Sequence, residues 1–143
     1  MFEHYPSPVI FAHRGDLTYA PENTLPSFQQ ALQKGADGVE LDAKLTADGQ
    51  VIVIHDMTVD RTTTGKGRVA SFKLDDIRKL DAGKWFDEKF NGTKVPMLAE
   101  VFELVGKDKL INIELTNYST PRDGLVLKVC ELIRRHNIQK QIL

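Results

Sequence analysis

The sequence predicts an α/β fold in which about four β-strands alternate with helices. The chain contains four apolar runs, and the first, residues 9–12, shows no polar alternation, which suits a strand covered on both faces in a parallel sheet. Segments with apolar residues at helical spacing separate most of these runs. Each run also ends in polar residues, at the sheet edge where active sites assemble in such folds. The predicted strands are residues 9–12, 38–44, 51–55 and 110–115.

The first two strands are expected to flank a helix in a β-strand, helix, β-strand unit. Thr24 is a suitable N-cap for a helix with apolar residues at 25, 28, 31 and 32, and Gly35 ends this helix. A helical crossover of this kind implies that the two strands pair in parallel. Further helices are predicted within 71–80, after Pro96 and after Pro121, and residues 142–143 resemble the start of another strand.

The link between the second and third strands leaves two arrangements open. Only residues 45–50 connect these strands, which is too short for a helical crossover. A hairpin through Asp48 and Gly49 is the simpler solution and is favoured by the sequence. The alternative is an extended return that leaves the third strand parallel, because His55 would then lie at the same edge as His13.

Composition and charge limit the classes of function. The chain has 143 residues, of which 41% are hydrophobic, and we expect one domain spanning residues 1–143. The formal charge of −1 gives no basic surface for nucleic acid. Cys130 falls in a helical apolar pattern and is expected to be a buried core thiol. No apolar run reaches the roughly 20 residues of a membrane span, and we expect a cytoplasmic protein.

Two acidic residues in the second strand predict a cation site. Glu40 and Asp42 are two residues apart, so their side chains project from the same face of the strand. Glu114, near the end of the fourth strand, adds a third carboxylate. An all-oxygen set suits Mg²⁺ or Ca²⁺ rather than zinc. His13 and His55, which end two other strands, are then available as a general acid and base.

Eight motifs, taken together in this order and spacing, closely resemble the glycerophosphodiester phosphodiesterase family. They cover nearly the whole chain from residue 9 onward: His13-Arg14-Gly15, Pro21-Glu22-Asn23-Thr24, Glu40-x-Asp42, Thr46-x-Asp48-Gly49, His55-Asp56, Arg61-Thr62-Thr63 to Gly67, Pro96-x-Leu98-x-Glu100-Val101 and Asn112-Ile113-Glu114.

The resemblance implies a (βα)₈ barrel that hydrolyses glycerophosphodiesters to glycerol 3-phosphate and an alcohol. Glu40, Asp42 and Glu114 match the family's ligands for a divalent cation. His13 and His55 match its acid and base, and Arg14 matches a phosphate contact. The resemblance also implies that the third strand is parallel, against the hairpin that the short link favours.

Two departures from the family pattern are visible. Thr116 stands where the family usually has a lysine that contacts phosphate. A full barrel takes roughly 250 residues, so 143 residues supply about half of one. Two unpaired sheet edges favour a homodimer that completes the barrel. The alternatives are a non-catalytic, truncated or engineered half-barrel, and a phospholipase-D-like member of the superfamily acting on sphingomyelin or lysophospholipids.

Overall fold

The computed structural model describes residues 7–115 and 122–143, and it is organised around one long strand, β2 (Gly38–Leu45). Strand β1 (Phe11–His13) pairs with β2 in parallel, with Phe11 opposite Gly38. Strand β4 (Leu110–Leu115) pairs with β2 in parallel over six residues. Residues 38–40 of β2 pair with both neighbours, so β1 and β4 lie on opposite edges of β2.

Strand β3 (Val51–Val53) pairs with β2 in antiparallel orientation, with Lys44 opposite Ile52. The parallel third strand that the family resemblance implied is therefore wrong, and the hairpin favoured by the short link is correct. The turn is held by the Thr46 hydroxyl, which donates to Asp48 Oδ1 at 2.6 Å, while Gly49 has a φ of 73°. A link of this length can reverse the chain but cannot carry it back along the sheet.

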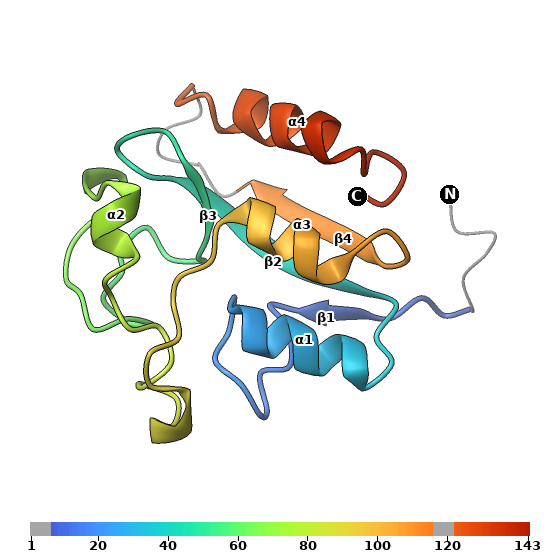
Figure 1. The fold of residues 1–143 in the computed structure, drawn as a ribbon, viewed down its shortest axis with the longest axis horizontal. Coiled ribbons are helices and arrows are strands. Elements are labelled where there is room, and N and C mark those ends of the chain that lie inside the picture. Colours follow the sequence, from blue (N-terminus) through green and yellow to red (C-terminus); the bar gives the residue numbers. More distant parts are fainter. Residues whose placement is uncertain (1–6, 116–121) are drawn as a thin grey trace.

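The parallel part of the sheet therefore runs from β1 through β2 to β4. Ile111 of β4 forms an isolated parallel bridge with Ile142, and the Ile111 N–H donates to the carbonyl of Gln141 at 2.9 Å. This bridge falls within residues 142–143, which were expected to begin another strand. Strand β3 lies beside the end of β2 and is not one of the parallel strands (Figure 1).

Helices cover one face of β2 and leave the other face for polar side chains. Helices α1 (Leu25–Gln33), α3 (Leu98–Val105) and α4 (Leu125–His136) contribute Phe28, Phe102 and other side chains to the main core. Val39, Leu41 and Ala43 of β2 are buried in the same core. Because side chains alternate along a strand, Glu40, Asp42 and Lys44 must project from the opposite face.

Residues 54–95 fold over β3 as a smaller unit with its own apolar core. Ile52, Ile54, Val59, Val69 and Ile77 are buried together there. The short elements of this segment are η1 (Val69–Ser71), α2 (Leu74–Ile77) and η2 (Glu88–Phe90). Helix α2 lies within the short helix predicted from the sequence.

Helix α4 corrects one expectation about the core. Leu125 and Val129 are buried, as their spacing predicted, but Cys130 is exposed. The next position along a helix is rotated by about 100°, which turns Cys130 away from the stripe that Val129 occupies. Pro121, which was expected to precede this helix, lies outside the described residues, as does Thr116.

Candidate active site

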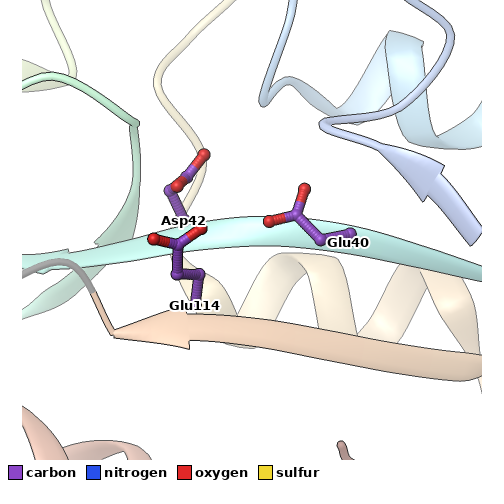
Figure 2. Close-up of side chains that lie close together, drawn as sticks. All are labelled: Glu40, Asp42 and Glu114. Atoms are coloured by element: carbon purple, nitrogen blue, oxygen red, sulfur yellow. The ribbon is translucent and has the colours of Figure 1, made fainter.

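Three carboxylates meet on the face of the sheet that the helices leave open. Glu40 and Asp42 come from β2, and Glu114 of β4 stands directly opposite Asp42 in the strand register. One oxygen of each carboxylate lies within 4.8 Å of one oxygen of each of the others. Figure 2 shows the three side chains on the same side of the sheet, with Asp42 and Glu114 adjacent. The structure thus brings together the three acids singled out in the sequence.

The surroundings of Asp42 fit a bound cation. Its side chain is fully buried, and Oδ2 accepts a hydrogen bond from Asn23 Nδ2 at 2.9 Å and lies 3.2 Å from Arg14 Nε. Among the described residues, Oδ1 has no hydrogen-bond partner. A buried carboxylate oxygen without a donor is costly unless something absent from the protein chain satisfies it. Oxygen ligands alone are the set that Mg²⁺ and Ca²⁺ prefer.

The pKa of Glu40 also fits a cation bound at this cluster. Burial raises the pKa of Glu40, and the charges of Asp42 and Glu114 add to this rise. A hydrogen bond from the Arg14 backbone N–H to Glu40 Oε2, at 3.0 Å, acts in the opposite direction. Carboxylates that raise one another's pKa repel, and a divalent cation between them would remove that repulsion.

His13 and Arg14 enter the site from the end of β1. His13 Nε2 lies 3.9 Å from Glu40 Oε2, and its side chain is 62% exposed, so the imidazole is open to an incoming ligand. Arg14 has a φ of 54°, in the left-handed region, which turns the chain sharply after the strand. Its Nη1 lies 3.3 Å from Glu22 Oε1, so the guanidinium bridges Glu22 and Asp42.

His55 follows β3, which pairs with the end of β2 at Ala43–Leu45. The hairpin fixes its backbone, because the N–H of Ile54 donates to the carbonyl of Asp42 at 3.0 Å. His55 Nδ1 lies 2.7 Å from Asp56 Oδ1, and the imidazole is 38% exposed. Hydrogen bonds from Arg61 lower the pKa of Asp56 to about 2, so Asp56 is a carboxylate at neutral pH.

Three residues near the cluster were not selected from the sequence as site residues. Lys44 follows Asp42 on the same face of β2, is 5% exposed, and has a pKa lowered by burial. Strand alternation alone could have indicated it. Glu22 and Asn23 belong to a loop, and only the folded path of that loop brings them to Arg14 and Asp42.

Comparison with known proteins identifies the family. The sequence profile of the glycerophosphoryl diester phosphodiesterase family matches residues 13–129. The chain belongs to this family. A glycerophosphodiester phosphodiesterase from Caldanaerobacter subterraneus subsp. tengcongensis is 48% identical over 136 residues, which is 94% of this chain and 56% of that protein. One from Bacillus altitudinis is 43% identical over 94% of this chain and 56% of that protein.

Solved structures of the family have the same fold. A glycerophosphodiester phosphodiesterase from Agrobacterium tumefaciens superimposes with a TM-score of 0.86 at 41% identity, covering 93% of this chain and 55% of that one. A phosphodiesterase from Oleispira antarctica, solved in complex with the product sn-glycerol-3-phosphate, also has a TM-score of 0.86, at 33% identity and with 90% and 53% coverage. The predicted half of a (βα)₈ barrel is confirmed.

The chain spans about half the length of the curated relatives it matches. Within the described residues, the segments that pair in parallel are β1, β2, β4 and the bridge at Ile142, so β3 belongs to the hairpin and not to the barrel wall.

No helix within residues 7–115 and 122–143 is both long enough and apolar enough to cross a bilayer.

Proposed function

We propose that this chain carries the catalytic apparatus of a divalent-cation-dependent phosphodiesterase, which hydrolyses glycerophosphodiesters to glycerol 3-phosphate and an alcohol. The observation that supports this most strongly is the cluster of Glu40, Asp42 and Glu114, with the unpartnered Asp42 Oδ1, in a family that acts on this class of substrate. The sn-glycerol-3-phosphate bound to the Oleispira antarctica relative supports the same class of product.

Glu40, Asp42 and Glu114 would hold the cation, Mg²⁺ or Ca²⁺. When bound, such an ion supplies positive charge that stabilises the phosphoryl oxygens as negative charge builds on them. Arg14 adds a fixed positive charge beside the cluster, and its bridge to Glu22 and Asp42 holds the guanidinium in place. We assign Arg14 to the phosphate, because a planar guanidinium suits phosphate oxygens.

His13 and His55 would move the protons. His13 lies beside Glu40 and is exposed, while His55, after β3, is held by Asp56. One imidazole takes a proton from the attacking hydroxyl and the other gives a proton to the leaving oxygen. A hydroxyl of the substrate's own glycerol is the favoured nucleophile, because it is already close to the phosphorus. Its attack forms a new P–O bond, breaks the bond to the alcohol and leaves a cyclic phosphodiester, which a water molecule must then open to give glycerol 3-phosphate. Direct attack by water is the alternative.

The second candidate is a non-catalytic half-barrel that retains the motif residues. It is favoured by the exposure of apolar side chains beside β1, such as Ile10 at 57%. A homodimer that completes the barrel would reconcile this open edge with catalysis, and we keep it as a proposal about assembly.

An assay with glycerophosphocholine separates the two candidates. Release of choline and glycerol 3-phosphate is measured with Mg²⁺ or Ca²⁺ added, after chelation, and after the cation is restored. We expect turnover that chelation abolishes and cation addition restores. Lysophosphatidylcholine and sphingomyelin, assayed in parallel, test the phospholipase-D-like alternative.

A matched pair of variants locates the activity. Asp42→Asn should abolish turnover, whereas Asp75→Asn, which removes an acid from helix α2, should leave the rate unchanged. Absence of cation-dependent turnover from a folded chain, at concentrations where it is fully assembled, would overturn the catalytic proposal and leave the non-catalytic half-barrel.

A further inference from the structure

Arg61 lies between two carboxylates and contacts each of them twice. Its Nε and Nη2 donate to Oδ2 and Oδ1 of Asp56 at 2.8 and 3.0 Å. Its Nη1 and Nη2 donate to Oε2 and Oε1 of Glu22 at 2.7 and 2.8 Å. Such bidentate pairing fixes the orientation of each carboxylate and is the strongest form of arginine–carboxylate contact.

The contact to Asp56 has a direct consequence for His55. Asp56 Oδ1 accepts from Arg61 Nη2 and also lies 2.7 Å from His55 Nδ1. Because Asp56 remains ionised, with a pKa lowered to about 2, it can only accept hydrogen bonds. The proton of a neutral His55 imidazole must then sit on Nδ1, which leaves the lone pair of Nε2 available.

We propose that Arg61 is a positioning residue that holds His55 in the Nδ1–H tautomer by clamping Asp56, and that it ties this arrangement to the loop carrying Arg14. The proposal rests on the proposed function, because it gives His55 an acid–base role. Its structural part, the tautomer, can be tested without any reaction.

The second half of the clamp explains why an arginine is needed at this position. Glu22 receives Arg61 on one side and Arg14 Nη1 on the other, and Arg14 Nε lies next to Asp42. The contacts from His55 to the cation cluster therefore run through side chains of alternating negative and positive charge, in the order Asp56, Arg61, Glu22, Arg14 and Asp42. Without Arg61, Glu22 would keep only Arg14 as a partner, and Asp56 would lose both arginine contacts and be free to turn away from His55.

A simpler role for Arg61 would be to fasten its own loop. That loop already has local ties, since Asp60 Oδ1 accepts from the Gly67 N–H at 2.7 Å and the Thr63 hydroxyl donates to the carbonyl of Val59 at 2.7 Å. Arg61 is also 45% exposed, so its ion pairs alone contribute modestly to stability. The two roles differ in what they predict for His55.

The test uses nuclear magnetic resonance of the metal-free chain, labelled with ¹⁵N at histidine, at about pH 8.5 where imidazoles are neutral. Long-range ¹H–¹⁵N spectra distinguish the two tautomers of each ring, and a His55→Gln spectrum assigns the resonances of His55. We expect the Nδ1–H form for His55 in the wild type. In Arg61→Gln the Nε2–H form should become substantially populated, and Arg61→Lys should give an intermediate result.

Lys66→Gln is the matched control. Lys66 is a cation of the same loop, 3.8 Å from Asp60 and 79% exposed, and it has no part in the clamp. This variant should leave the His55 tautomer unchanged. Circular dichroism and thermal melting establish that all variants are folded.

Kinetics of the active protein provide the second readout. Arg61→Gln should lower kcat by about 10–100-fold with KM changed less than about threefold, because an imidazole in the wrong tautomer slows proton transfer more than binding. An unchanged His55 tautomer in folded Arg61→Gln would overturn the proposal. If the tautomer shifts and no variant has activity, the clamp stands and the proposed function fails.

Discussion

The side-chain amide of Asn23 donates from Nδ2 to Oδ2 of Asp42 at 2.9 Å, whereas Oδ1 of the same carboxylate has no hydrogen-bond partner within residues 7–115 and 122–143. One oxygen is therefore held by the protein while the other is left for a ligand. The backbone of Asn23 is left-handed, with a φ of 54°. Groups that orient a metal ligand in this way are usually needed for full affinity.

We predict that Asn23→Ala weakens Mg²⁺ or Ca²⁺ binding by about 10–100-fold, because the Asp42 carboxylate loses the donor that orients it. Isothermal titration calorimetry measures the affinity. Asn137→Ala is the matched control, since Asn137 has a φ of 55° at the end of α4. It carries the same backbone cost and should leave the affinity unchanged. Equal losses in both variants would contradict the role given to Asn23.

The turn after β1 is predicted to depend on Gly15. A Cβ at Gly15 would clash with Ser27 Oγ and lie 2.7 Å from the backbone carbonyl carbon of Ser27, which cannot move without shifting helix α1. Gly35 has a similar φ, +94° against +91°, with no atom within 4 Å of its Cβ position. We expect Gly35→Ala to cost about 1 kcal/mol of unfolding free energy and Gly15→Ala about 2–3 kcal/mol more.

Urea denaturation of both glycine variants measures this difference. The expected order of midpoints is wild type, Gly35→Ala, Gly15→Ala. Similar midpoints for the two variants would mean that Ser27 gives way easily, and the tight contact between the β1 turn and helix α1 would not be a determinant of stability.

The Asp56–Arg61 pair predicts a specific loss of stability in acid. Arg61 lowers the pKa of Asp56 from 3.8 to about 2 in the folded chain. The stabilisation is therefore fully present above about pH 4 and is lost as the pH falls through about 2. Allowing for solvent screening of this partly exposed pair, it amounts to about 1 kcal/mol. Asp56→Asn should lack this part of the pH dependence.

Urea unfolding of wild type and Asp56→Asn between about pH 2 and 6 tests this. Asp75→Asn serves as the control, because Asp75 lies on the short helix α2 and outside the ion-pair network. The free-energy difference between wild type and Asp56→Asn should shrink as the pH is lowered, and by more than the difference between wild type and Asp75→Asn. Parallel curves for all three proteins would argue against the pair.

The open side of β1 predicts self-association. Ile10 and Leu17 are 57% and 43% exposed and line a cavity of about 420 Å³ beside His13. We predict that the chain is a homodimer at micromolar concentration, with an interface of more than about 2,000 Å², and that Ile10→Lys shifts it to monomer. Leu127→Lys, at an exposed apolar position on α4, should have no effect.

Light scattering coupled to size-exclusion chromatography measures the mass of each variant. A cooperative, fully folded wild-type monomer would refute the dimer. Dimerisation unaffected by Ile10→Lys would place the interface on another face of the protein.

Local patterns in the sequence were sufficient for much of the fold. The apolar spacing that begins at Leu25 predicted helix α1, because a helix needs only its own residues to present an apolar stripe. The short link at Asp48 and Gly49 predicted the hairpin, and it did so correctly where the family resemblance misled, because a chain of that length has few ways to connect two strands. The prediction that Cys130 is buried was wrong, because a shift of one position along a helix decides whether a side chain faces the core.

The candidate site, too, was predicted in part from local patterns in the sequence, while the rest depended on the tertiary structure. Alternation along β2 was enough to put Glu40 and Asp42 on one face, because that period is a property of the extended backbone itself. Three further relationships became visible only in the tertiary structure. Glu114 stands opposite Asp42, Asn23 leaves one oxygen of Asp42 unpartnered, and Arg61 joins Glu22 to Asp56. The Asn23–Asp42, Glu22–Arg61 and Asp42–Glu114 contacts join residues 19 to 72 positions apart, and their geometry is set by strand register and loop packing, which no local spacing encodes.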